Sequence, residues 1–181
     1  MIKALVFDWG NTIMRDFPEK KGPMWEWDQV EYIPFAEESL KVLHNEFSMC
    51  IASNAGCSDT AQMIKALKRV GAEIYFNHFF TSKEIGYEKP HIEFFLAIFN
   101  KLNVAPSECV MIGDNYVKDI CGAKDAGMKT VFYNASNDLG KFIKADKIIT
   151  SLKFLPNTIK ELNLKKIALF YFSKVRISRF S

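Results

Sequence analysis

Four short stretches of this 181-residue chain hold residue types that can bind a metal and a phosphoryl group. Three of the stretches end apolar runs and the fourth precedes a proline; their polar residues are Asp8, Ser53-Asn54, Lys89, and Gly113-Asp114 with Asp119. A carboxylate can attack phosphorus or bind a hard cation through oxygen. Hydroxyl and backbone donors at a helix start can hold an anion, and lysine supplies positive charge. Together these residues predict one site.

A metal is expected between two of these carboxylates. If the strands that end in Asp8 and Asp114 are neighbours, the two side chains converge. Carboxylates this close repel unless a cation lies between them. Because the site offers oxygen ligands and neither nitrogen nor sulfur, Mg²⁺ is the expected occupant.

The elements that must position these residues can be read from apolar periodicity. Strand-like runs cover residues 3–8, 48–53, 78–82, 109–113 and 130–133, with a weaker run near 147–150. A helix capped by Ser58 or Asp59 should end at Gly71, and a second should have Pro90 in its first turn. Strands and helices alternate, which predicts an α/β fold: a Rossmann-like three-layer sandwich with a mostly parallel central sheet.

Residues 14–34 interrupt this alternation. The segment has no clear period and contains Trp25 and Trp27, which would point the same way in an extended stretch. It follows the strand that ends in Asp8, so it should overhang the carboxyl ends of the strands, where open α/β sheets bind ligands. The two indoles either plug the top of the sheet or also shape a pocket.

Composition is that of one globular domain, expected over residues 1–162. No apolar stretch approaches the ~20 residues that span a bilayer, and no basic-then-apolar leader begins the chain, so a cytoplasmic location and no membrane partner are expected. The four cysteines lack metal-ligand spacing and are expected to be reduced. Residues 163–181 form a basic, aromatic C-terminal extension with five Lys or Arg and no acid. The rest carries a formal charge of −2, which argues against a nucleic-acid partner.

The motifs resemble those of the haloacid dehalogenase superfamily, in its phosphatase type with a minimal cap. The resemblance covers residues 2 to about 162. It rests on Val6-Phe7-Asp8-Trp9-Gly10-Asn11-Thr12, Ile51-Ala52-Ser53-Asn54, Glu88-Lys89-Pro90, and Gly113-Asp114-Asn115 with Asp119. Four motifs in this order are specific.

The resemblance implies a role for each of these residues. Asp8 would be the nucleophile that forms an aspartyl-phosphate, and Mg²⁺ would be held by Asp8, the carbonyl of Gly10 and Asp114. Ser53 and Lys89 would bind the phosphoryl oxygens, with Asn54 beside them. Thr12, Asn115 and Asp119 would support the arrangement.

Gly10 departs from the family pattern. Most phosphatases of this family carry a second aspartate there, which protonates the leaving group and then activates water. Glycine keeps the carbonyl for the metal but provides no acid, and losing a general acid typically costs ~10²–10⁴ in rate. Asp16, Glu19 and Asp28 of the insert are the nearest substitute candidates.

Two other chemistries of the superfamily fit less well. The dehalogenases need no metal and are not expected to carry an aspartate where this chain has Asp114. The phosphonate-cleaving members need a large helical cap, which the roughly 20 residues between Met14 and Pro34 cannot supply. The sequence therefore favours a Mg²⁺-dependent phosphatase that hydrolyses a phosphomonoester.

The alternative is a catalytically weak phosphate-binding or regulatory protein in which the C-terminal extension is the working surface. For the phosphatase, a small cap leaves the site open. The partner is then either a phosphorylated small molecule, with a second subunit of a homo-oligomer closing the pocket, or a larger phosphorylated substrate. The sequence leaves these readings open.

Overall fold

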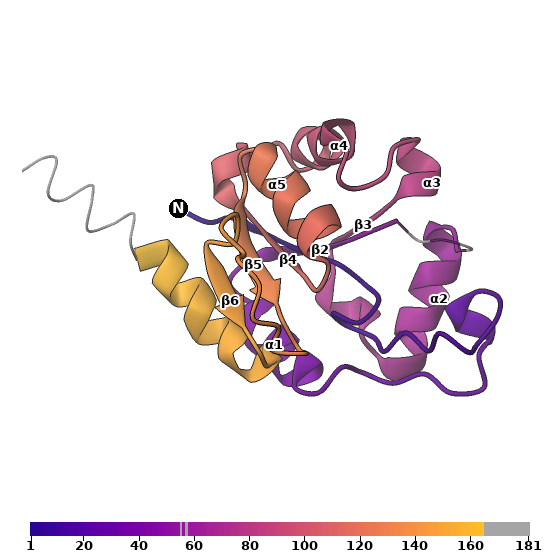
Figure 1. Cartoon of the computed structure of the whole chain (residues 1–181). Helices are drawn as coiled ribbons and strands as arrows, with labels where there is room; N and C mark the ends of the chain where they lie inside the picture. The colour runs from indigo at the N-terminus through magenta and orange to yellow at the C-terminus, as the bar shows by residue number, and fades with distance from the viewer. Residues whose placement is uncertain (55, 57, 165–181) are drawn as a thin grey trace, which may run out of the picture.

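A single parallel sheet of six strands forms the centre of the molecule in a computed structural model, which describes residues 1–54, 56 and 58–164 (Figure 1). The strands lie in the order β3-β2-β1-β4-β5-β6. Their bounds are Ala4–Phe7 (β1), Ser48–Ser53 (β2), His78–Thr81 (β3), Cys109–Gly113 (β4), Lys129–Tyr133 (β5) and Lys147–Ile149 (β6). This is the Rossmann order of an open α/β sheet, and it confirms the predicted fold class and all six strands.

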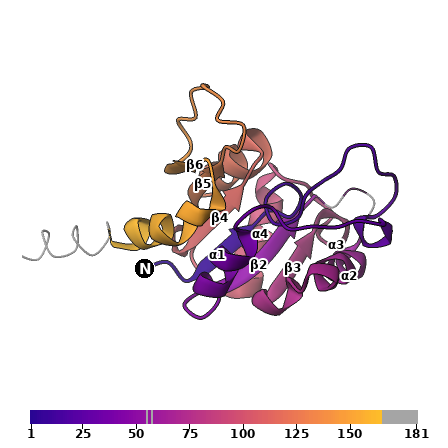
Figure 2. The ribbon, with the colours of Figure 1, turned by 90° about the horizontal axis from the view of Figure 1, so that it is seen from below.

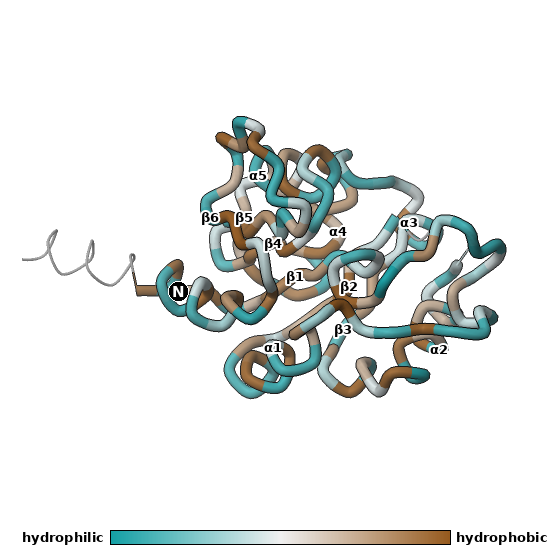
Figure 3. The backbone as a smooth tube through the Cα atoms, turned by 60° about the horizontal axis from the view of Figure 1, so that its bottom comes forward, coloured by the Kyte–Doolittle hydropathy of each residue, from teal (hydrophilic) through white to brown (hydrophobic). Residues whose placement is uncertain are grey.

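Helices cover both faces of the sheet, and the central strands are therefore buried on both sides. One face packs against α1 (Ala36–Leu43), α2 (Thr60–Val70) and the helical residues 155–164, through side chains such as Leu5 and Phe7. The other packs against α4 (Ile92–Leu102) and α5 (Gly122–Asp125), through Ala4 and Val6. Figures 1 and 2 show the two layers, and Figure 3 shows apolar residues concentrated along the strands.

The two predicted helices are present, with one correction. Asp59 caps α2 in a reciprocal capping box with Gln62, and Gly71 ends the helix in the left-handed conformation, as predicted. Pro90 does not lie in the first turn of α4. His91 is the N-cap of that helix and donates its N–H to the Glu88 carbonyl, so the Lys89-Pro90 segment forms a separate turn. The short helix α3 (Ser82–Ile85) and helix α1 had no counterpart among the predictions.

The insert at residues 14–34 is short and closed at its base. Arg15 donates its N–H to the Glu31 carbonyl, and Ile33 to the Ile13 carbonyl, so the two ends of the insert pair with each other. In between lies one 3-10 turn, Met24–Glu26. The extended stretch that would align the two indoles is therefore absent, because Trp25 lies within this turn.

Helix α2 anchors the insert through two of its side chains. The Arg69 guanidinium donates to the carbonyls of Trp25, Trp27 and Asp28, and Lys65 lies 4.6 Å from the centre of the Trp25 ring. Figure 1 shows the insert beside α2. Both indoles pack against the core on the α2 face of the sheet, and Trp27 also lines a pocket.

The connection from β5 to β6 contains no helix, unlike the alternation that the sequence suggested. The C-terminal extension from residue 165 onward lies outside the described residues, as does Cys57. In the described part of the chain, the other three cysteines are free thiols, and no helix is both long and apolar enough to cross a bilayer.

Candidate active site

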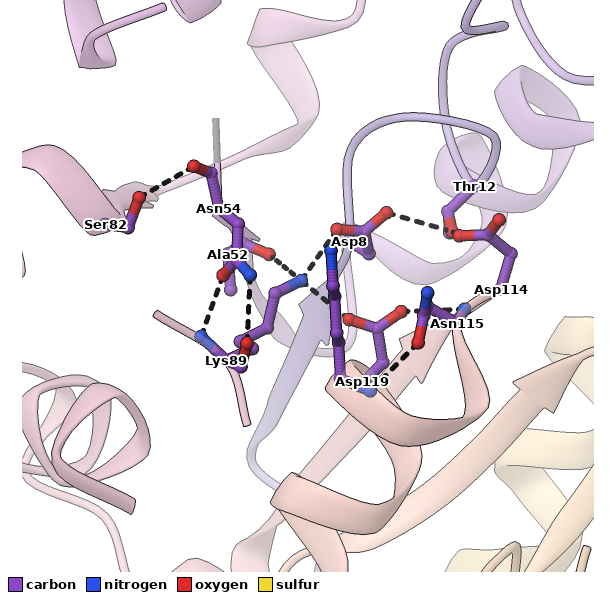
Figure 4. A network of polar contacts seen from close by, with 10 residues as sticks. Asp8, Thr12, Ala52, Asn54, Ser82, Lys89, Asp114, Asn115 and Asp119 are labelled. Atoms are coloured by element: carbon purple, nitrogen blue, oxygen red, sulfur yellow. Dashed lines mark hydrogen bonds and ion pairs between the residues drawn. The ribbon is translucent and has the colours of Figure 1, made fainter. Parts of the chain in front are cut away.

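Asp8 follows the central strand β1, at the edge where all the strands present their carboxyl ends (Figure 4). Strand β1 pairs with β2 on one side and β4 on the other. The strands before β4 are added to one side of β1 and the later strands to the other side, so the strand order switches between β1 and β4. Ligands of open α/β sheets bind at this switch point. The Asp8 N–H donates to the Ile112 carbonyl at 2.9 Å, which fixes the carboxylate beside the end of β4.

Lys89 lies at the centre of the polar network. Its Nζ donates at 2.7 Å to Asp8 Oδ1, Asp119 Oδ1 and the Ala52 carbonyl, and its side chain is 2% exposed. Burial by itself would lower the pKa of Lys89, but the charges of Asp119 and Asp8 outweigh it and raise the pKa. The ammonium is therefore a fixed positive charge next to Asp8 throughout the physiological pH range.

The Asn54 side chain orients Lys89 through its backbone. Asn54 Oδ1 accepts from the Lys89 N–H at 2.8 Å, and Nδ2 donates to the Lys89 carbonyl at 2.9 Å. Ser82 Oγ in turn donates to the Asn54 carbonyl at 2.7 Å. The sequence predicted Asn54 among the phosphate-binding residues. In the structure its side chain holds the loop that carries Lys89. Ser53 ends β2, is buried, and lines the pocket next to Asp8.

Asp119 supports Lys89 from the helical turn that follows β4. Besides its pair with Lys89, its Oδ2 accepts from the Asn115 N–H at 3.0 Å, so both carboxylate oxygens are occupied. Burial raises its pKa to about 6, although the Lys89 charge acts in the opposite direction. A Cβ on Gly113 would lie 2.3 Å from Asp119 Oδ2. Only glycine at position 113 leaves room for this carboxylate.

Asp114 brings a second carboxylate to Asp8, as predicted. Oxygens of Asp8, Asp114 and Asp119 lie within 4.8 Å of one another. Burial, followed by the charges of Asp8 and Asp119, raises the pKa of Asp114 to about 7. The Thr12 hydroxyl is 3.3 Å from Asp114 Oδ1 and 3.5 Å from Asp8 Oδ2, so it lies between the two carboxylates. Three clustered carboxylates with one lysine leave uncompensated negative charge that suits a divalent cation.

The turn after Asp8 presents Gly10 to the same pocket. In this turn the N–H groups of Ile13 and Met14 donate to the Trp9 carbonyl, and the Asn11 N–H donates to the Met14 carbonyl. Among the residues that the structure describes, no hydrogen bond engages the Gly10 carbonyl, which leaves it available to a metal. The residues present therefore fit Mg²⁺, with oxygen donors from Asp8, Gly10 and Asp114.

Asp16 lies next to the missing side chain at position 10. A Cβ built on Gly10 would be 3.7 Å from Asp16 Cβ and 3.8 Å from Asp16 Oδ2. Asn11, in the left-handed conformation, accepts the Asp16 N–H on its side chain at 3.0 Å and so holds Asp16 over the turn. Of the other two candidates, Glu19 does not line the pocket and Asp28 is ion-paired with Lys20.

A pocket of about 790 Å³ connects these parts. It is lined by the strand-end residues Asp8, Ser53, Lys89 and Asp114 and by the insert from Asp16 to Trp27, which we call the roof. All the residues predicted to form the site thus lie around one pocket or directly support it. The buried Thr12 supports it from beneath.

Residues 11–133 match the family model of haloacid dehalogenase-like hydrolases. The match covers about two thirds of the chain and includes three of the four motifs in full. The chain belongs to this family.

Curated relatives of this haloacid dehalogenase-like protein are phosphatases. It is 32% identical over 123 residues to a ribulose-1,5-bisphosphate 5-phosphatase from Halopiger xanaduensis, covering 68% of this chain and 51% of that protein. It is 36% identical over 135 residues to a glyceraldehyde 3-phosphate phosphatase from Pyrococcus furiosus, covering 72% of this chain and 55% of that protein. The chain thus spans about half the length of these relatives.

Solved structures share the fold. A protein described as uncharacterized from Listeria monocytogenes serotype 4b superposes with a TM-score of 0.78 at 24% identity, covering 90% of this chain and 99% of that one. A HAD phosphatase from Thermococcus onnurineus gives 0.72 at 22% identity, covering 87% and 98%. These likenesses extend across nearly the whole described domain.

Proposed function

We propose that this protein is a Mg²⁺-dependent phosphatase that hydrolyses a phosphomonoester through an aspartyl-phosphate on Asp8. The observation that carries the proposal is the convergence of Asp8, Lys89, Asp114 and Asp119 at one strand edge beneath a pocket. The phosphatase names of its relatives support the reaction class. They also favour a phosphorylated small molecule as the substrate.

In the first step an Asp8 oxygen attacks phosphorus, and the bond from phosphorus to the ester oxygen breaks. Lys89, which is ion-paired with Asp8, and Ser53 stabilise the charge on the phosphoryl oxygens. Mg²⁺, when held by Asp8, Asp114 and the Gly10 carbonyl, neutralises the negative charge that gathers on the transferring group. The leaving oxygen takes up one proton as it departs.

In the second step water attacks the phosphorus of the aspartyl-phosphate and gives up a proton. The bond from phosphorus to the Asp8 oxygen breaks, which regenerates the carboxylate and releases inorganic phosphate. The geometry favours Asp16 for both proton transfers, because it lies next to Gly10 and lines the pocket.

The test is hydrolysis of p-nitrophenyl phosphate in the presence of Mg²⁺, since this leaving group needs little help from an acid. We expect turnover that EDTA abolishes and that excess Mg²⁺ restores. The Asp8→Asn variant should fold, as judged by circular dichroism, and lose at least about 10³-fold in kcat. Equal turnover by the wild type and this variant would rule out the covalent mechanism. Binding of inorganic phosphate without any turnover would instead favour a phosphate-binding or regulatory role.

A further inference from the structure

Four lysines line the pocket, and they differ in what they contact. They are Lys20, Lys21, Lys89 and Lys118. Lys89 is paired with Asp8 and Asp119, and Lys20 with Asp28. Among the described residues, no carboxylate lies within ion-pair distance of Lys21 or Lys118. These two ammonium groups are therefore available to a ligand.

Lys21 differs from Lys118 in its position relative to the reacting phosphorus. Lys118 belongs to the helical turn Tyr116–Cys121, which follows β4 and carries Asp119. Lys21 belongs to the insert, which lines the same pocket as Asp8. In a phosphoryl transfer the attacking and leaving oxygens are roughly in line. The leaving group must therefore point away from Asp8, and the insert supplies more of the pocket lining than any other segment of the described chain.

The backbone at Lys21 is held in place. The indole Nε1 of Trp27 is 3.2 Å from both the Lys21 and the Gly22 carbonyls, and Gly22 has the positive φ of 77° that lets the chain turn there. Arg69 fixes the next residues of the insert to α2. The lysine is thus presented from a built loop, and only its side chain needs to be ordered by a ligand.

We propose that Lys21 binds a second anionic group, carboxylate or phosphate, on the leaving group of the substrate. The inference rests on the proposed phosphatase function and names its substrate class: a phosphomonoester with a second negative charge. The pocket volume of about 790 Å³ far exceeds what one phosphoryl group fills, so such a leaving group has room. Because the insert is anchored, this charge preference is a fixed property of the roof.

The test compares substrates in matched pairs that differ by the second charge. The first pair is 3-phosphoglycerate and glycerol 1-phosphate, and the second is fructose 1,6-bisphosphate and fructose 6-phosphate. For each pair, kcat/KM of the substrate with the second anionic group is divided by kcat/KM of the substrate without it. This ratio is measured for the wild type and for Lys21→Gln, Lys21→Arg, Lys118→Gln and Lys101→Gln. Lys101 lies at the end of α4, outside the pocket, and controls for the loss of one surface charge.

We expect the wild type to prefer the substrate with the second anionic group in at least one pair. A preference in the first pair indicates that Lys21 binds a carboxylate, and one in the second pair indicates a phosphate. Lys21→Gln should lower that ratio about 10- to 100-fold, mainly through KM, because a charge-assisted hydrogen bond is lost. Lys21→Arg should keep most of it, and Lys101→Gln should not change it. A wild type without preference, a ratio that survives Lys21→Gln, or a loss seen only in Lys118→Gln would overturn the inference. Hydrolysis of no phosphate ester at all, p-nitrophenyl phosphate included, would overturn the proposed function itself.

Discussion

At the scale of single residues, the site is a set of short contacts that leave little freedom to Lys89. Its ammonium has three acceptors at 2.7 Å, and both groups of its peptide backbone are held by Asn54. A buried lysine is stable only when its charge is compensated. The phosphoryl group would thus meet a cation that is already oriented, which is the condition for effective electrostatic catalysis.

Gly113 is predicted to be essential for this orientation. A Cβ there would lie 2.3 Å from Asp119 Oδ2, so Gly113→Ala should displace Asp119 and weaken its pair with Lys89. We expect a loss of about 2–4 kcal/mol in the free energy of unfolding and at least a tenfold loss in kcat. Urea denaturation and p-nitrophenyl phosphate kinetics measure the two effects. Gly10→Ala is the matched control, because its Cβ would have only ordinary contacts at 3.7 Å and should not destabilise the fold.

The proton relay is predicted to depend on Asp16. Asp16→Asn should lower kcat about 10²–10⁴-fold on an alkyl phosphate and much less on an aryl phosphate, whose leaving oxygen needs little protonation. Gly10→Asp places a carboxylate in the family's usual position, where an added Cβ has only ordinary contacts. In the Asp16→Asn background it should restore alkyl-phosphate hydrolysis. If Asp16→Asn hydrolyses both esters at wild-type rates, this account of the proton is wrong.

At the scale of elements, the insert is a small roof that α2 holds in position. Its residues form no helix of their own beyond the turn Met24–Glu26, so its shape depends on its contacts. Arg69 supplies three of these by donating to backbone carbonyls, and Lys65 packs over Trp25. Because the roof carries Lys20, Lys21 and Asp16 into the pocket, its stability should affect substrate binding.

Arg69→Ala is predicted to release the insert without unfolding the domain. Loss of hydrogen bonds from a charged donor should favour opening of the insert by at least about tenfold. Trypsin should then cleave faster after Lys20 or Lys21, as followed by mass spectrometry under native conditions. Lys68→Ala is the control, since Lys68 is the exposed neighbour of Arg69 on the same helix. Trypsin should cleave this variant after Lys20 or Lys21 at the wild-type rate. Equal cleavage of both variants would mean that Arg69 does not hold the roof.

The strands were predictable from sequence because each is a short apolar run that ends in a polar residue or glycine at the same sheet edge. The candidate site positions follow from that edge, which is why the sequence pointed to Asp8, Ser53 and Asp114. The roles of Asn54 and Gly113 were not, since they depend on a contact with Lys89 and on a close approach of Asp119. The insert was recognised only by its lack of period. Neither its turn at Trp25 nor its anchor at Arg69 leaves a signal in a single sequence.

At the scale of the whole molecule, the carboxylate cluster links stability to pH and to metal. Asp114 has its pKa raised from 3.8 to about 7, first by burial and then by the charges of Asp8 and Asp119. Between these pH values the unfolded chain has lost the proton that the folded protein still binds. The metal-free protein should therefore lose stability as pH rises from about 4 to about 7, and this contribution should stay constant above pH 7.

Mg²⁺ is predicted to reverse this loss, because it binds the ionised carboxylates that are otherwise destabilising. The shift in pKa corresponds to at most about 4 kcal/mol, and solvent screening in an open pocket reduces it. We expect Mg²⁺ to raise Tm by about 4–8 °C at pH 8 and by much less at pH 5, as followed by thermal denaturation. Asp114→Asn keeps an acceptor for the Thr12 hydroxyl but cannot ionise. Without metal it should therefore be more stable than the wild type at pH 8 and similar to it at pH 4, and Mg²⁺ should hardly affect it. A wild-type Tm that Mg²⁺ raises equally at both pH values would show that the ionisation of this cluster does not control metal binding.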